Sequence, residues 1–229
     1  MTTHNPYAAP NAVTLAPGAL QNLAGQHYVP LGWRTALAAI CVLGMTMFDV
    51  AMRVLELELG PDLKVAGGAD LVKVALFGLV GLAVMVLSLG GWVFVSVWIH
   101  RAASNLRGLG RYGMAFSPAG CVGWFFVPFA NLWKPAQAMG EIWRASDPEA
   151  DQGSWFTSKG TSLVGIWWSA WMMCSFVSCA SLVTRDIPSS SAAIGLASCA
   201  FRGIAAVALV QLMRGIASRQ AQAAARLGA

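Results

Sequence analysis

Charged side chains are scarce in this 229-residue chain, since Asp, Glu, Lys and Arg together make up only 11% of it. Soluble globular proteins carry about 25% charged residues. Hydrophobic residues reach 57%, and they gather in runs of about twenty residues, the length that a helix needs to cross a bilayer. The scarcity of charge therefore excludes an ordinary soluble domain and predicts an integral membrane protein.

Sequence motifs for catalysis, metal binding and nucleic-acid binding are also lacking. Two of the three histidines, His4 and His27, lie near the N-terminus, and the five cysteines show no CxxC spacing. No HExxH, GxSxG, Walker or dinucleotide-binding motif occurs. The net charge is +5, but the basic residues form no cluster that could follow a phosphate backbone. We therefore expect no enzymatic activity, no metal site, no cofactor and no nucleic-acid partner.

Four segments are apolar and long enough to span a bilayer as helices. They lie at about residues 33–57, 71–100, 161–184 and 191–214. Gly60-Pro61 and Ile187-Pro188 mark two short turns, because proline cannot continue a helix and glycine permits a turn. The predicted fold is an all-α membrane protein with four transmembrane helices.

The two ends of the chain are predicted to be tails around a transmembrane domain of residues 33–218. Residues 1–32 contain no charged side chain and four prolines, so a disordered tail is expected there. Residues 219–229 are expected to form a short C-terminal tail. If the N-terminus is cytoplasmic, ten of the fifteen Lys and Arg fall on the cytoplasmic side, in keeping with the positive-inside rule. Both termini are therefore predicted to be cytoplasmic.

Between the second and third predicted helices lies a distinct segment, residues 117–146, which we call the interfacial block. Its apolar part, 117–133, is short and is interrupted by Pro118 and Pro128. Such a run is typical of a re-entrant or interfacial segment, and a fifth crossing is the alternative. The rest predicts an amphipathic helix in the interface plane. Its polar face comprises Lys134, Gln137, Glu141 and Arg144, and its other face Ala136, Met139, Gly140 and Trp143.

Two sets of residues are candidates for binding a ligand or partner. Trp98, Arg101 and Asn105 share one face at the end of the second helix. Arg101 and Asn105 could hold an anionic head group or a substrate carboxylate. Alternatively, Arg101 extends to lipid phosphates while Asn105 caps a helix end or bonds the backbone of the interfacial block. The second set lies in the block and comprises Trp124, Pro128, Asn131, Trp133 and Glu141.

Two charges lie inside the apolar segments, Asp49 in the first helix and Arg202 in the fourth. An arginine at the centre of a membrane helix costs about 2.5 to 3.5 kcal/mol and should be compensated. We predict an interhelical ion pair between Asp49 and Arg202. A local Asp49–Arg53 pair is the alternative, and a role for Asp49 in moving protons or ions is a further one.

The chain resembles an uncharacterised bacterial family of multi-pass membrane proteins that is known only as a domain of unknown function. The resemblance covers residues 95–148. It is carried by W-x2-R-x3-N from Trp98, Ser117-Pro118, GWFF-x-P-x2-NLW-x-P from Gly123 and E-x-W-x2-S from Glu141. The resemblance implies a protein of the bacterial inner membrane and brings no activity with it.

Two functions are compatible with these patterns. The first is a non-enzymatic module that binds lipid or a protein partner, or assists assembly, through the interfacial block. The second is a small transporter or channel subunit, which would need a homo-oligomer because four helices make a thin pathway. Transport requires that Asn131, Arg101 or Asp49 face an aqueous cavity, whereas a binding module does not.

Overall fold

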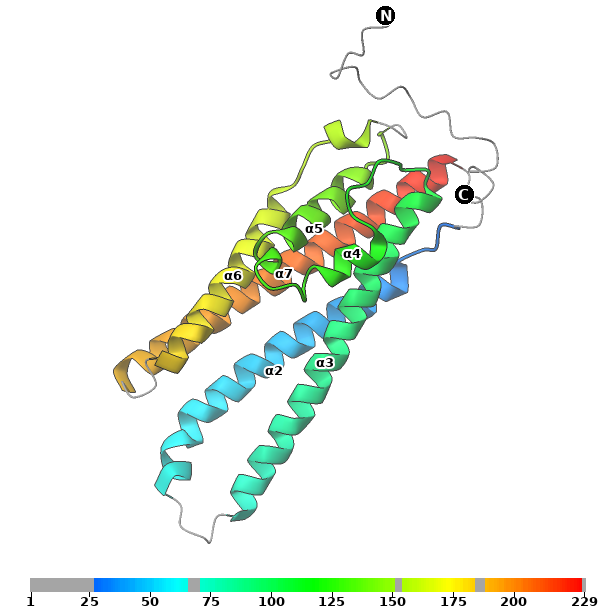
Figure 1. Ribbon diagram of the computed structural model, residues 1–229. Coiled ribbons are helices and arrows are strands. Elements are labelled where there is room, and N and C mark those ends of the chain that lie inside the picture. The colour runs from blue at the N-terminus through cyan, green and yellow to red at the C-terminus, as the bar shows by residue number, and fades with distance from the viewer. Residues whose placement is uncertain (1–26, 66–70, 151–153, 184–187, 228–229) are drawn as a thin grey trace, which may run out of the picture.

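The computed structural model describes residues 27–65, 71–150, 154–183 and 188–227, which contain helices and no strand (Figure 1). The four long helices are α2 (Gly32–Val65), α3 (Leu71–Gly108), α6 (Ser162–Val183) and α7 (Pro188–Leu227). Each contains a stretch long and apolar enough to cross a membrane. The prediction of an all-α membrane protein with four transmembrane helices is confirmed.

The long helices form two hairpins that lie side by side. α6 packs along α7, and α2 packs against both α3 and α7, so the two hairpins meet through α2 and α7. Figure 1 shows that residues 27–31 and the end of α7 lie at the same end of the bundle. We call this the terminal end of the bundle, and the other the hairpin end.

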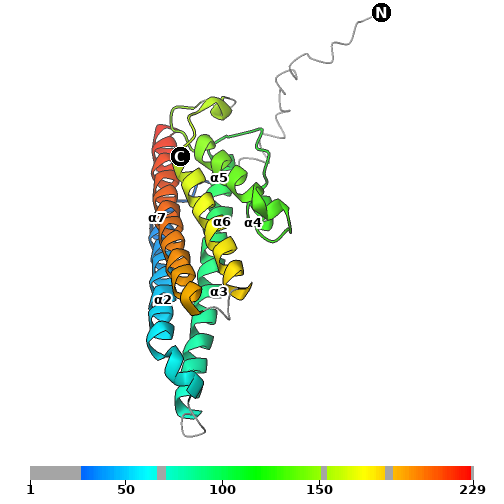
Figure 2. The ribbon, with the colours of Figure 1, turned by 90° about the vertical axis from the view of Figure 1, so that its left-hand side faces the viewer.

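Four short elements connect α3 to α6 and lie against one side of the bundle near its terminal end (Figure 2). They are α4 (Pro118–Gly123), η2 (Ala130–Leu132), α5 (Lys134–Ala145) and η3 (Trp155–Thr157). The first three lie within the interfacial block. Its predicted helix therefore has the expected bounds, and its apolar part is folded into a short helix and turns.

Two predicted boundaries were wrong at the ends of the chain. α7 continues through the expected C-terminal tail to Leu227, because a buried stripe extends along it through Ile216, Gln220, Ala223 and Ala224. Leu31 and Gly32 were assigned to the N-terminal tail but belong to the fold, since Leu31 is buried and α2 begins at Gly32. Residues 1–26 lie outside the described part of the chain.

The inner helix boundaries also differ from the predicted ones. α2 continues through Gly60-Pro61 to Val65, and α3 extends eight residues beyond the expected end at 100, to Gly108. A proline removes one backbone hydrogen bond and kinks a helix without always ending it, and Figure 1 shows α2 bent in this region. The second predicted turn is consistent with α7 beginning at Pro188.

The core is concentrated at the terminal end, and apolar side chains face outward along the rest of the bundle. Fully buried residues there include Trp98, Leu106, Met139, Ile142, Leu212, Met213 and Ile216. Further along, a lipid-facing belt of exposed apolar residues surrounds the helices. It includes Met47 and Val54 on α2, Leu82, Met85, Leu89 and Val93 on α3, Phe176 on α6, and Leu196, Ile204 and Val207 on α7.

Candidate functional site

Asn105 lies in a closed network of hydrogen bonds at the terminal end. Its Oδ1 accepts from Val29 N at 3.2 Å, and its Nδ2 donates to Val29 O at 2.8 Å and to Gln220 Oε1 at 3.1 Å. Gln220 Nε2 in turn donates to Ala102 O at 2.9 Å and to Ser146 Oγ at 3.1 Å. We call these groups the amide network.

The amide network assigns Asn105 a structural role. Asn105 is 1% exposed and Gln220 is 0% exposed, so a ligand could reach neither side chain. The sequence had suggested that Asn105 caps a helix end or bonds the backbone of the interfacial block. Its side chain does neither. It holds the segment that precedes α2 against α3 and α7.

Trp98 and Arg101 share a face with Asn105, as their spacing predicted, but that face is turned toward the protein. Trp98 is buried, and its Nε1 donates to Thr35 Oγ1 at 2.9 Å. Arg101 is half-buried and donates through Nη2 to His27 O at 3.4 Å. This set therefore ties α3 to the start of α2 and forms no open site for a head group.

α4 positions an aromatic ring between α3 and α6. Ser117 caps the helix by accepting a hydrogen bond from Gly120 N at 3.0 Å, and Pro118 occupies its first turn, where a missing N–H is tolerated. Trp124 follows as the C-cap. Next comes Phe125, whose ring lies 6.1 to 6.5 Å from those of Trp92, Trp167 and Trp168. We call Trp92, Phe125, Trp167, Trp168 and Trp171 the aromatic cluster.

Residues 126–133 form an apolar tip on the outside of the bundle. Phe126 is 76% and Phe129 is 80% exposed, and Pro128 and Trp133 are exposed with them. Trp168 Nε1 donates to Leu132 O at 2.8 Å, which fastens the tip to α6. Asn131 is half-buried, and its Oδ1 has no hydrogen-bond partner among the described residues.

The start of α5 places a cation beside the tip. Lys134 Nζ lies 5.4 Å from the ring centroid of Phe116 and 5.8 Å from that of Trp124, which is within the range of cation–π attraction. The tip and Lys134 together present an apolar edge next to a positive charge.

Glu141 does not lie on an exposed polar face of α5, and that prediction was wrong. Glu141 as a whole residue is 5% exposed, because the segment before α4 covers it, and Phe116 N donates to its Oε1 at 3.4 Å. Burial raises the pKa of Glu141. Burial, together with the charge of Glu141, also raises the pKa of the Cys121 thiol to about 12. Burial therefore favours the protonated form of both groups.

Arg111, which the sequence analysis did not single out, fixes the loop after α5. It is 4% exposed and donates to Asp147 O at 2.8 Å and to Ala150 O. Trp155 Nε1 adds a hydrogen bond to Tyr112 O at 2.7 Å. Buried donors of Arg111 and Trp155 thus bond backbone carbonyl oxygens and hold the loops on both sides of the interfacial block.

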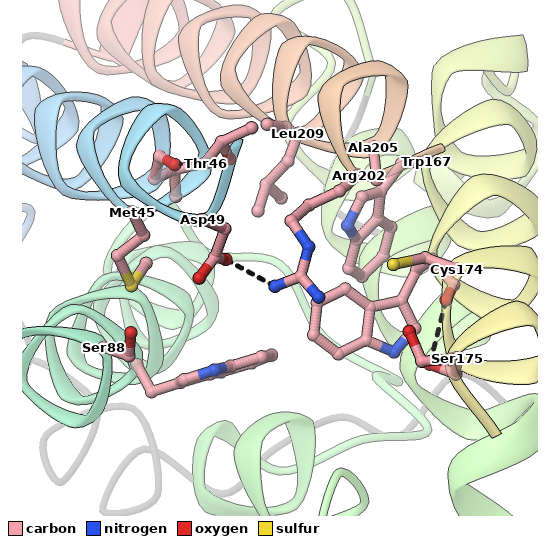
Figure 3. A pocket seen from close by; sticks show the side chains of 15 residues that line it. Met45, Thr46, Asp49, Ser88, Trp167, Cys174, Ser175, Arg202, Ala205 and Leu209 are labelled. Carbon is pink, nitrogen blue, oxygen red and sulfur yellow. Dashed lines mark hydrogen bonds and ion pairs between the residues drawn. The ribbon is translucent and has the colours of Figure 1, made fainter. Parts of the chain in front are cut away.

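Asp49 and Arg202 meet in a cavity of about 330 Å³ between α2, α3, α6 and α7 (Figure 3). Arg202 Nη1 lies 2.5 Å from Asp49 Oδ2, and the two side chains are 43% and 28% exposed. The structure thus brings together the two charges whose pairing the sequence suggested. Of the three residues that could mark a transport path, Asp49 lines this cavity, whereas Arg101 and Asn131 lie elsewhere.

Besides Arg111, sequence reasoning missed three residues that shape these sites: Thr35, Gln220 and Trp167. Gln220 follows Ile216 by one turn and precedes Ala223 by three residues, so the apolar spacing marks it as buried. Thr35 and Trp167 give no such signal, because their roles depend on contacts between helices. Among the described residues, no group of His, Cys, Asp and Glu is arranged to hold a metal ion.

Comparison with known proteins gives a family and no relative of known activity. No curated protein and no solved structure matches the chain. The model of a family described as "Domain of unknown function (DUF4328)" matches residues 62–225, which include α3, the interfacial block, α6 and nearly all of α7. Asp49 precedes the matched region, and Arg202 lies within it. Since the match covers more than half of the chain, this protein belongs to that family of domains of unknown function.

Proposed function

We propose that this integral membrane protein is a non-enzymatic module that binds anionic membrane lipid through the apolar tip and Lys134. The observation that carries the proposal is the exposure of the tip next to a cation. Large exposed apolar patches mark sites of contact with membranes or partners. An adjacent lysine suits the head group of an anionic lipid.

The depth of the tip supports a lipid-binding role. Phe125, which immediately precedes the tip, contacts Trp92. Trp92 precedes Arg101 by nine residues on α3, or about 13 Å along a helix. Val93 and Val97 at this level are apolar and exposed. With Arg101 near the head groups, the tip would reach the acyl chains of one leaflet, since the whole hydrocarbon core is about 30 Å thick. The proposal thus includes a re-entrant or interfacial position for residues 117–133.

The depth can be measured with a spin label at Phe129→Cys in a cysteine-free chain reconstituted into vesicles. We expect the label to be relaxed by oxygen and shielded from a water-soluble nickel reagent. Lys159→Cys, on an exposed loop, is the matched control and should show the opposite accessibility. Equal exposure of both labels to nickel would overturn the proposal.

The lipid preference can be measured by mass spectrometry of lipids retained by the purified protein. We expect enrichment of phosphatidylglycerol over phosphatidylcholine. Lys134→Gln should reduce the enrichment severalfold, and Phe126→Ser combined with Phe129→Ser should lower total retention. If these variants retain the same lipids as the original chain, the tip is not the binding surface.

Transport is a second candidate, favoured by the position of Asp49 and Arg202 in a cavity. Phe125, Trp92 and Trp167 pack together near this cavity, so a path toward the terminal end would require their rings to move. Ion flux into vesicles that contain the protein tests this candidate. Flux that disappears when both charges are replaced by leucine would support it, and absence of flux would exclude it for the ions used.

We also propose that the terminal end of the bundle faces the cytoplasm of a bacterium and that the protein resides in the inner membrane. The number of basic residues on that side supports this orientation. Reporter fusions after Leu227 and within the 184–187 connection should give cytoplasmic and external signals, respectively. The reverse pattern would invert the topology.

A further inference from the structure

The proposed function does not involve the cavity around Asp49 and Arg202. Apolar side chains such as Val42 and Leu209 and the indoles of Trp92, Trp167 and Trp171 form much of its wall. The volume of about 330 Å³ lies within the range of small-molecule sites in proteins, roughly 300 to 1,000 Å³. Its polar groups determine which ligand it can hold.

Arg202 has more hydrogen-bond donors than partners. A guanidinium has five N–H groups, and among the described residues Asp49 is the one hydrogen-bond partner, through Nη1. The Arg202 side chain is 43% exposed and lines the cavity. Donors without acceptors are costly at membrane depth, so the remaining N–H groups call for acceptor oxygens in the cavity.

Trp167 contributes a second donor of the same kind. The residue is 3% exposed, and Figure 3 places its ring beside Arg202 in the cavity wall. Its indole N–H has no acceptor among the described residues, whereas the indole groups of Trp98, Trp155 and Trp168 each have one. A buried indole N–H normally finds an acceptor, so Trp167 also points to a ligand oxygen.

Among the described residues, no hydroxyl group of the cavity is hydrogen-bonded to Arg202 or Trp167. Thr46 donates to Val42 O at 2.8 Å and Ser175 to Trp171 O at 3.0 Å, each within its own helix. The Asp49–Arg202 pair has no net charge, and a second anion would meet the Asp49 carboxylate. The arrangement therefore favours a neutral ligand that accepts hydrogen bonds.

The position of the cavity indicates that such a ligand comes from the bilayer. Leu89 on α3 and Phe176 on α6, which lie close in sequence to lining residues, are exposed and apolar. α3 and α6 meet at this level through the edge-to-face contact of Trp92 with Trp171, at 4.9 Å. We propose that the cavity binds a neutral, membrane-soluble molecule whose carbonyl oxygens accept hydrogen bonds from Arg202 and Trp167. This site is independent of the tip.

Calorimetric titration of the full chain in detergent micelles tests the proposal with two sources of carbonyl groups. One probe is decylubiquinone, with its reduced quinol as the comparison. The other is a short-chain diester phosphatidylcholine, with its diether analogue as the comparison. Saturable binding of a carbonyl probe at least tenfold tighter than that of its comparison is expected, and the pair that shows it identifies the source.

Two variants link the binding to the named donors. Trp167→Phe removes the indole N–H and should weaken binding about threefold to tenfold. Asp49→Leu combined with Arg202→Leu removes the other donor without leaving an unpaired charge, and should weaken binding more than tenfold. Trp155→Phe removes an indole N–H outside the cavity and should leave the affinity unchanged. Absence of saturable binding, or unchanged affinity in Trp167→Phe, would overturn the proposal.

Discussion

The terminal end of the bundle and the cavity between the hairpins differ in how their most prominent polar side chains are hydrogen-bonded. At the terminal end, Asn105 and Gln220 are buried and pair with each other and with backbone groups. In the cavity, Arg202 and Trp167 keep donors that no described residue accepts. Polar residues that stood out in the sequence are thus mostly structural where the packing is dense, although Arg34 Nη1, Arg101 Nε and Arg219 Nε are buried there without a partner among the described residues.

This difference indicates where function resides in the transmembrane part. Buried polar groups that are fully satisfied make a core more specific and rigid. A site that binds a ligand must instead leave groups unpaired until the ligand arrives. The terminal end is therefore the scaffold, and the cavity and the tip are the surfaces that remain available.

The largest effect is expected from breaking the amide network. Gln220→Leu removes the partner of Asn105, Ala102 and Ser146 and leaves their polar groups buried, at about 1 to 3 kcal/mol for each such group. We expect the free energy of unfolding to fall by about 3 kcal/mol. Denaturant titration in detergent measures this change.

Gln222→Leu is the matched control. Gln222 lies two residues after Gln220, on the opposite side of α7, and is exposed. Its effect should stay within about 0.5 kcal/mol. Similar losses in both variants would mean that the network does not stabilise the terminal end more than the surface does.

Replacing one glycine in each region by alanine compares the packing of the terminal end with that of the cavity. A Cβ at Gly215 would lie 2.5 Å from the Trp143 ring, and one at Gly91 would lie 2.5 Å from Met45 Sδ. The indole is rigid and lies between α5 and α7, whereas methionine has several rotatable bonds. We expect Gly215→Ala to cost about 2 kcal/mol and Gly91→Ala less than about 1 kcal/mol. Thermal unfolding of the two variants checks the order, and a larger loss at Gly91 would reverse our view of the cavity as the looser region.

The ion pair is expected to have a moderate effect because its side chains are partly exposed. Arg202→Leu alone leaves Asp49 unpaired at membrane depth and should lower stability by about 1 to 2 kcal/mol. Replacing Asp49 by leucine as well should restore most of the loss. Unfolding of the two single variants and the double variant forms the required cycle. Silent single variants would show that the pair contributes nothing to the packing of α2 against α7.

The smallest effect concerns the pH dependence that Glu141 confers. Because burial raises its pKa, the folded chain binds the Glu141 proton more tightly than the unfolded chain does. This contribution is fully present below the ordinary glutamate pKa of about 4.3 and is lost as pH rises through the folded value. Glu141→Gln keeps an oxygen that can accept from Phe116 N and should gain stability relative to the original chain as pH rises. Parallel pH dependence of the two unfolding temperatures would contradict this assignment.

The sequence predicted the features that depend on local pattern. Apolar length identified the four membrane helices, and the helical spacing of polar residues from Lys134 to Arg144 identified α5. The pairing of the isolated charges Asp49 and Arg202 could be predicted because a membrane interior offers few alternative charged partners. These are cases in which one physical constraint acts along the chain or leaves only one candidate partner.

The remaining features depend on which helix faces meet, and local pattern does not specify this. The sequence around Asn105 does not show whether its amide is exposed or buried. Its structural role follows only from the positions of Val29 and Gln220, which bond it. Glu141 falls on the charged face of α5 by spacing, but the segment before α4 covers that face. The donor of Trp167 is notable only because no described acceptor lies near it. Contacts of this kind require the tertiary structure.

The amide network also has a consequence for the biosynthesis of the protein. Asn105 and Gln220 are 115 residues apart, and α7 leaves the ribosome after α2, α3 and α6. Until α7 is in place, Asn105 can bond Val29 but lacks its partner on the other side, so the first three helices enter the bilayer with this junction open. α7 then completes the contact that holds residues 27–31 in position. A single buried amide thus couples the beginning of the described chain to the insertion of α7.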